Sequence, residues 1–84
     1  MIEVKLFAAL RERAGRDSVT VSPPPSVTSV FQLLDWLAGQ DAQLAAALAA
    51  TPRLMIAVNE MLASEDASLA EGDVVALFPP VTGG

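Results

Sequence analysis

The sequence contains no cysteine and no histidine. Disulfides, thiolate nucleophiles, imidazole bases and the usual zinc ligands are therefore missing from its side chains, so we expect neither a metal site nor an enzyme that works alone. Because it also lacks a signal-peptide pattern at the N-terminus, we expect a cytoplasmic protein. No apolar run approaches the roughly 20 residues needed to span a bilayer, so no membrane partner is expected.

Basic residues are scarce as well, and none follows Arg53. The chain has 5 Lys and Arg against 10 Asp and Glu, a net charge of -5. This sign disfavours nucleic-acid binding. The acidic last third is expected either to form a solvated surface or to steer the protein toward a basic partner. Its carboxylates occupy predicted turns, where such residues are common, and do not form a persuasive catalytic pair.

What is present is one small domain with a hydrophobic content of 52% in 84 residues. Residues 1–7 alternate between apolar and polar side chains, which predicts a half-buried strand. Residues 8–14 predict a helical turn or tight connection that Gly15 ends. A second strand is predicted over residues 17–22, and the three prolines at 23–25 end it, because proline cannot donate to a strand ladder.

The middle of the chain predicts helices. Residues 26–39 carry apolar side chains at helical spacing, with Ser29 and Gln32 as a capping box and Gly39 at the C-terminal end. The apolar positions are Val30, Leu33, Leu34 and Leu37. A second, short helix is predicted over residues 41–50.

The last third predicts two more strands, over residues 54–59 and 74–78, with a connection over 63–70. The resulting β-β-α-(α)-β-β order predicts an α+β fold, a mixed sheet with one main helix packed on one face. The strand at 74–78 is apolar on both sides, which is typical of a central strand. Loops and the short helix could cover the second face, or it could be a partner interface that includes Phe7, Leu77 and Phe78.

The C-terminal residues offer a different kind of reactive group. We expect residues 1–78 to form the domain and residues 79–84 a flexible tail of Pro79, Pro80, Val81, Thr82, Gly83 and Gly84. Extended, six residues reach roughly 20 Å, enough to enter the active site of another protein. The terminal glycines lack a β-carbon and can thread a narrow channel. The carboxylate of Gly84 is then the candidate reactive group, once another protein has activated it, for example as an acyl-adenylate.

Several segments resemble one family. The ending Leu77-Phe78-Pro79-Pro80-Val81-Thr82-Gly83-Gly84 is similar to that of the small subunits of molybdopterin synthase, which are ubiquitin-like β-grasp sulfur carriers. Further similar segments are Ala57-Val58-Asn59, Glu71-Gly72-Asp73, Val4-Lys5-Leu6-Phe7-Ala8 and Leu10-Arg11-Glu12. The resemblance covers essentially the whole chain, and the proline triplet is its one noted departure.

This resemblance implies that an E1-like enzyme adenylates Gly84 with ATP and that a sulfur donor protein converts it to a thiocarboxylate. The tail, with Gly83 as the threading residue, then enters the large synthase subunit. That subunit supplies the catalytic side chains, and sulfur passes to cyclic pyranopterin monophosphate. The chain itself is expected to bind no cofactor.

Three alternatives share the Gly-Gly ending. The chain could carry sulfur for another pathway, such as thiamin synthesis, or it could be a ubiquitin-like modifier joined to lysines. It could also be a β-grasp binding module whose Gly-Gly end is incidental.

Overall fold

The computed structural model describes residues 1–80 of the chain. A five-stranded sheet has the order β2-β1-β5-β3-β4, with β1 and β5 parallel and the other neighbours antiparallel. The elements are β1 Ile2–Leu6, α1 Ala8–Ala14, β2 Ser18–Val21, α2 Val30–Gln40, α3 Ala42–Ala49, β3 Met55–Val58, β4 Met61–Ala63 and β5 Val74–Phe78. The α+β class and the mixed sheet are confirmed.

The two central strands supply much of the core. In β1 the side chains alternate, with Val4 fully buried and Lys5 exposed. In β5 the alternation buries Val75 and Leu77 completely. Because β5 lies between β1 and β3, the central position expected for residues 74–78 is confirmed.

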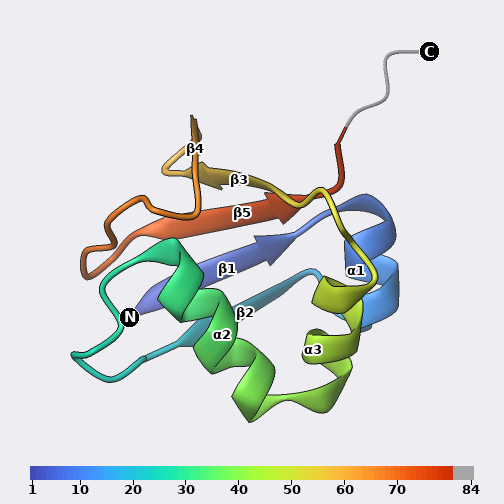
Figure 1. The fold of residues 1–84 in the computed structure, drawn as a ribbon, viewed down its shortest axis with the longest axis horizontal. Helices are drawn as coiled ribbons and strands as arrows, with labels where there is room; N and C mark the ends of the chain where they lie inside the picture. The colour runs from blue at the N-terminus through green and yellow to red at the C-terminus, as the bar shows by residue number, and fades with distance from the viewer. Residues whose placement is uncertain (81–84) are drawn as a thin grey trace.

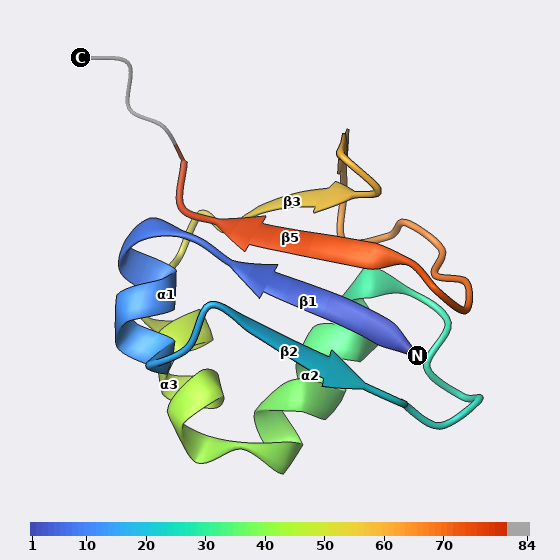
Figure 2. The ribbon, with the colours of Figure 1, turned by 180° about the vertical axis from the view of Figure 1, so that it is seen from behind.

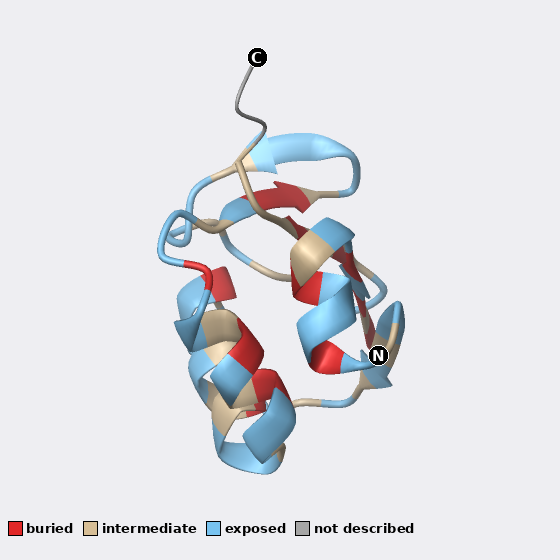
Figure 3. Ribbon diagram, turned by 90° about the vertical axis from the view of Figure 1, so that its right-hand side faces the viewer, coloured by how far each residue is buried: buried red, intermediate tan, exposed pale blue. Residues whose placement is uncertain are grey.

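Within residues 1–80, helices α2 and α3 form a layer over one face of the sheet, and α1 lies beside the ends of β1 and β5. Figure 1 shows α2 and α3 in front of the sheet, and Figure 2, from behind, shows β2, β1, β5 and β3 with no helix over them. Buried residues occur on strands and helices alike (Figure 3). The predicted main helix is α2, the longest of the described helices, and α1 and α3 add Leu10, Ala14, Leu44 and Ala47 to the core beside it. None of the helices within residues 1–80 is long and apolar enough to cross a membrane.

Helix α2 begins later than the sequence pattern predicts. Ser29 keeps an extended backbone and caps the helix, since its hydroxyl accepts the N–H of Gln32 at 3.2 Å. The other half of the predicted capping box is wrong: the Gln32 amide oxygen accepts the N–H of Thr28, not of Ser29. Gly39 does not end the helix either, because Gln40 is still helical and Asp41 follows it.

Asp41 fixes the corner between α2 and α3. Its backbone N–H donates to Leu37, and its carboxylate accepts the N–H groups of Gln43 and Leu44 at the start of α3. Arg16 pairs with the same carboxylate at 2.8 Å. The Leu44 N–H and the Arg16 guanidinium together lower the pKa of Asp41.

Two local features depart from the sequence prediction. The segment at 8–14 is a true helix, and Gly15 ends it with a φ of 75°. A β-carbon at Gly15 would come within 2.9 Å of Nε2 of Gln43, so both the backbone angle and the space favour glycine. The strand β4 was missed altogether, since three residues after a tight turn carry too little pattern to predict one.

Candidate functional site: the open face of the sheet and the C-terminal exit

The predicted reactive residues lie at the very end of the chain. Val81, Thr82, Gly83 and Gly84 fall outside the described residues. Pro79 and Pro80 are described: both are half-buried and follow directly on β5. The site can therefore be built up to the point where the chain leaves the sheet.

The C-terminal exit lies where three strands meet. The end of β5 pairs with the start of β3, with Phe78 opposite Met55. On the other side, the backbone N–H of Phe7 donates to the carbonyl of Leu77 at 3.2 Å. Figure 1 shows this end of β5 beside the start of β3. The exit is thus held by the central strands and does not begin in a loose loop.

An apolar patch lies on the sheet face that carries no helix. Because Leu77 faces the helices, its neighbours in β5 face the other way, and the strand register aligns further side chains with them. Phe7 is 46% exposed, Met55 36% and Leu62 71%. We define the open-face patch as Phe7, Met55, Leu62, Ala76 and Phe78.

The three predicted interface residues have different fates. Phe7 is exposed and Phe78 is half-buried, and both lie in the open-face patch. Leu77 has an exposed fraction of 0% and belongs to the hydrophobic core, so its prediction as a partner contact is wrong. The reason is the two-residue period of a strand, which sends adjacent side chains to opposite faces. The sequence did not predict Met55 and Leu62 as members of the open-face patch, because strand pairing brings them there and residue order alone does not reveal that pairing.

A hollow on the same face shares Phe7 and Ala76 with the open-face patch. It has a volume of about 410 Å³ and is lined by Lys5, Phe7, Asn59, Glu60, Val74 and Ala76. This lining of one ammonium, one carboxylate and one aromatic ring suits a partner's side chain better than a chemical reaction.

The turn after β3 is clasped to the start of β5. Asn59 donates from Nδ2 to Asp73 and accepts the N–H of Val74 at its Oδ1. The second carboxylate oxygen of Asp73 accepts the N–H of Ala70 at 2.9 Å. The Asn59 amide, followed by the Ala70 N–H, lowers the pKa of Asp73. Both carboxylate oxygens of Asp73 are therefore engaged in holding the fold.

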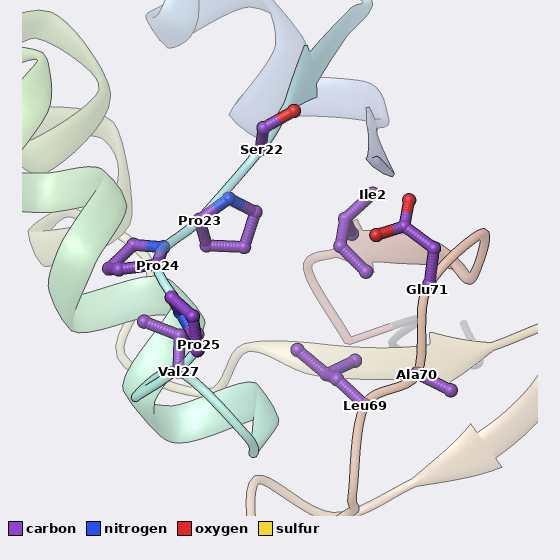
Figure 4. Close-up of a pocket in the computed structure, with 9 residues that line it drawn as sticks. All are labelled: Ile2, Ser22, Pro23, Pro24, Pro25, Val27, Leu69, Ala70 and Glu71. Carbon is purple, nitrogen blue, oxygen red and sulfur yellow. The ribbon is translucent and has the colours of Figure 1, made fainter.

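A second cavity, of about 170 Å³, lies at the opposite end of β1, between the proline triplet and the loop before β5 (Figure 4). Its one carboxylate belongs to Glu71, which pairs with the N-terminal ammonium of Met1. Pro23, Pro24 and Pro25 form one wall. This lining offers a stiff surface but no acid–base pair.

Comparison with known proteins gives consistent results. The family model described as the ThiS family matches residues 4–84. The chain is 44% identical to the molybdopterin synthase sulfur carrier subunit of Escherichia coli strain K12, with all of both chains covered. It is 30% identical to the protein of the same name from Dictyostelium discoideum, covering 98% of this chain and 94% of that protein.

Two solved structures share the fold. The crystal structure of SAMP1 from Haloferax volcanii has a TM-score of 0.78 and 34% identity, covering 99% of this chain and 98% of that one. A putative molybdopterin converting factor, subunit 1, from Pyrococcus furiosus has a TM-score of 0.74 and 28% identity, covering 95% and 97%. The ubiquitin-like β-grasp fold and the family resemblance are thereby confirmed: the chain belongs to the ThiS family.

Proposed function

We propose that this chain is the sulfur carrier subunit of a molybdopterin synthase. The observation that carries the proposal is the 44% identity, over the whole of both chains, to a subunit with that name. The fold supports it, because the central strand β5 leads straight into Pro79 and Pro80. A rigid sheet thus presents the segment that the chemistry requires.

Gly84 is the proposed reactive residue. Its carboxylate attacks the α-phosphate of ATP on an E1-like enzyme, pyrophosphate leaves, and a mixed anhydride with AMP forms. Hydrosulfide supplied by a sulfur donor protein then attacks the acyl carbon, the carbon–oxygen bond to AMP breaks, and a thiocarboxylate remains. The activation step is needed because a carboxylate is a poor electrophile. ATP is consumed by the activating enzyme and is not a cofactor of this chain.

The remaining tail residues are proposed to deliver that group. Pro79 and Pro80 favour an extended backbone, and Val81, Thr82 and Gly83 carry the terminus into the active site of the large synthase subunit. There the sulfur passes to cyclic pyranopterin monophosphate, and two such transfers build the dithiolene. The large subunit supplies the catalytic side chains, since this sequence has no thiol or imidazole.

The open-face patch is the proposed docking surface. Phe7 follows the last residue of β1, and Phe78 is the last residue of β5, so both lie at the C-terminal exit. A partner that covers these two side chains would therefore also receive the tail. Burial of large apolar side chains of this kind typically supplies most of the affinity of an interface.

A protein-modifier function is the second candidate. It is favoured by the similarity to a second solved structure, that of small archaeal modifier protein 1 from H. volcanii, to which this chain is 32% identical. Both functions use an activated terminal glycine, but they differ in the acceptor. A modifier gives isopeptide-linked products on lysines of other proteins, whereas a sulfur carrier gives none.

A reconstituted synthase tests the proposal. The full chain and a variant without Gly84 are each incubated with the activating enzyme, ATP, a sulfur source and the large subunit, and molybdopterin is measured. The full chain is expected to support product formation and the shortened one to support none. Because the core of the described residues ends at Leu77, both should melt at the same temperature. Equal product from both chains would contradict the proposal.

A further inference from the structure

We propose that the thioether of Met55 is an oxidation-sensitive modification site, and that its sulfoxide weakens docking through the open-face patch. The inference rests on the proposed function only in that the docking partner is the large synthase subunit. It adds reversible control of that docking by peroxide.

The sulfur inventory of the chain comes first. There are three methionines and no cysteine, so no thiol of this chain competes for an oxidant. All three methionines are accessible: Met1 is 58% exposed, Met55 36% and Met61 74%. Each sulfur can therefore be reached by a small peroxide from solvent.

Their positions differ, and this difference carries the inference. Met55 lies directly opposite Phe78, within the open-face patch and beside the C-terminal exit. Met61 lies opposite Val58, which the strand alternation places on the other side of the sheet. Met1 precedes β1 at the end far from Phe7, where its ammonium pairs with Glu71. One thioether of the three thus belongs to the proposed docking surface.

The chemistry is a two-electron oxygen transfer. A lone pair of the Met55 sulfur attacks one oxygen of hydrogen peroxide, the O–O bond breaks, and the sulfur–oxygen bond forms. The other peroxide oxygen leaves as water once it has been protonated. The sulfur is oxidised and the peroxide is reduced. A dithiol reductase reverses the step, forming water and a disulfide.

The product changes the surface that a partner must cover. Met55 is a flexible apolar side chain beside an aromatic one, a pairing that favours close packing. A sulfoxide is polar, and burying it against an apolar partner without a hydrogen bond opposes binding. Oxidation of Met55 should therefore weaken binding to the partner and leave the fold intact, because Met55 is outside the buried core.

The experiment compares the wild-type chain with M55L and M61L, two changes that keep apolar volume. Each is treated with hydrogen peroxide, and its affinity for the large subunit is measured by calorimetry before and after. Trypsin leaves both sulfurs on one peptide, since no Lys or Arg follows Arg53. Adding a protease that cleaves after Glu60 separates them, so that mass spectrometry reports the oxidation of each.

Peroxide is expected to weaken binding by about tenfold or more in the wild-type chain and in M61L, and to leave M55L unchanged. Treatment with methionine sulfoxide reductase and a thiol should restore the wild-type affinity. Unchanged binding by a chain oxidised at Met55, or equal loss in M55L, would overturn the inference while leaving the proposed function intact. If the untreated chain failed to bind the large subunit, the proposed docking itself would be refuted.

Discussion

Asn59 and Asp73 are joined by a hydrogen bond of 2.9 Å from Nδ2 to the carboxylate, across 14 residues of sequence. The same asparagine accepts the N–H of Val74 at 3.0 Å. Because Val74 begins β5, this clasp fixes the register of the strand that ends at the C-terminal exit. A local polar contact at one end of β5 thus helps to set where the chain leaves the sheet at the other.

Asn59→Ala should lower the free energy of unfolding by about 2–3 kcal/mol. The substitution removes the hydrogen bonds of the clasp, and it places alanine, which disfavours a left-handed backbone, at a φ of 51°. Asn59→Gly is the matched control, since glycine accepts that backbone angle and loses the side-chain hydrogen bonds alone. Urea denaturation should rank wild type above Gly above Ala. Equal stability of all three would show that the clasp contributes nothing.

The clasp also predicts a dependence on pH. The pKa of Asp73 is lowered in the folded state, so its contribution to stability is complete above the unfolded-state pKa and is lost as pH falls through the folded-state value. Asp73→Asn should therefore flatten the fall in stability between about pH 5 and about pH 2, measured by urea titrations at fixed pH. A slope as steep as that of the wild type would contradict the assignment.

Adjacent residues of β5 should respond differently to truncation. Leu77→Ala is expected to cost about 2–5 kcal/mol of stability, because its side chain is fully buried. Phe78→Ala should cost less stability and weaken docking to the large subunit more. Thermal melts and binding titrations on both variants check this. A docking defect in Leu77→Ala at full stability would restore Leu77 as a contact residue.

Phe7→Ala should weaken docking by about tenfold or more with little change in melting temperature. Phe31→Ala is its matched control: Phe31 is 57% exposed but lies on α2, on the opposite side of the sheet. Binding titrations should therefore separate the two. Equal losses of binding affinity from both substitutions would show that the open-face patch is not the docking surface.

Much of the fold could be predicted from sequence, because the alternation of residues 1–7 and the two-sided apolar strand at 74–78 are local signals. The start of α2 differs from the prediction by four residues, because the Ser29 hydroxyl caps the helix, Ser29 itself is extended, and Pro24 and Val27 close a turn before it. The placement of Leu77 also failed, because assigning it to a face requires knowing where the helices pack.

Of the open-face patch, the sequence predicted Phe7 and Phe78 but not the other members, and the role of the C-terminal tail stays a prediction. The Phe-Pro-Pro-Val-Thr-Gly-Gly ending indicates the chemistry through residue type and order. Met55 and Leu62 join the open-face patch through pairings between β3, β4 and β5, and the clasp of Asn59 to Asp73 joins separate turns. Such contacts arise from tertiary structure and leave no periodic signal.

The central claim is that Gly84 is loaded with sulfur. The purified chain, its activating enzyme, ATP and a sulfur source are incubated together, and the intact mass of the chain is measured, with the variant lacking Gly84 as the control. The account predicts a mass increase equal to one oxygen-to-sulfur exchange, located at Gly84 by fragmentation and absent from the control. An unchanged mass, or an exchange located elsewhere, would contradict it.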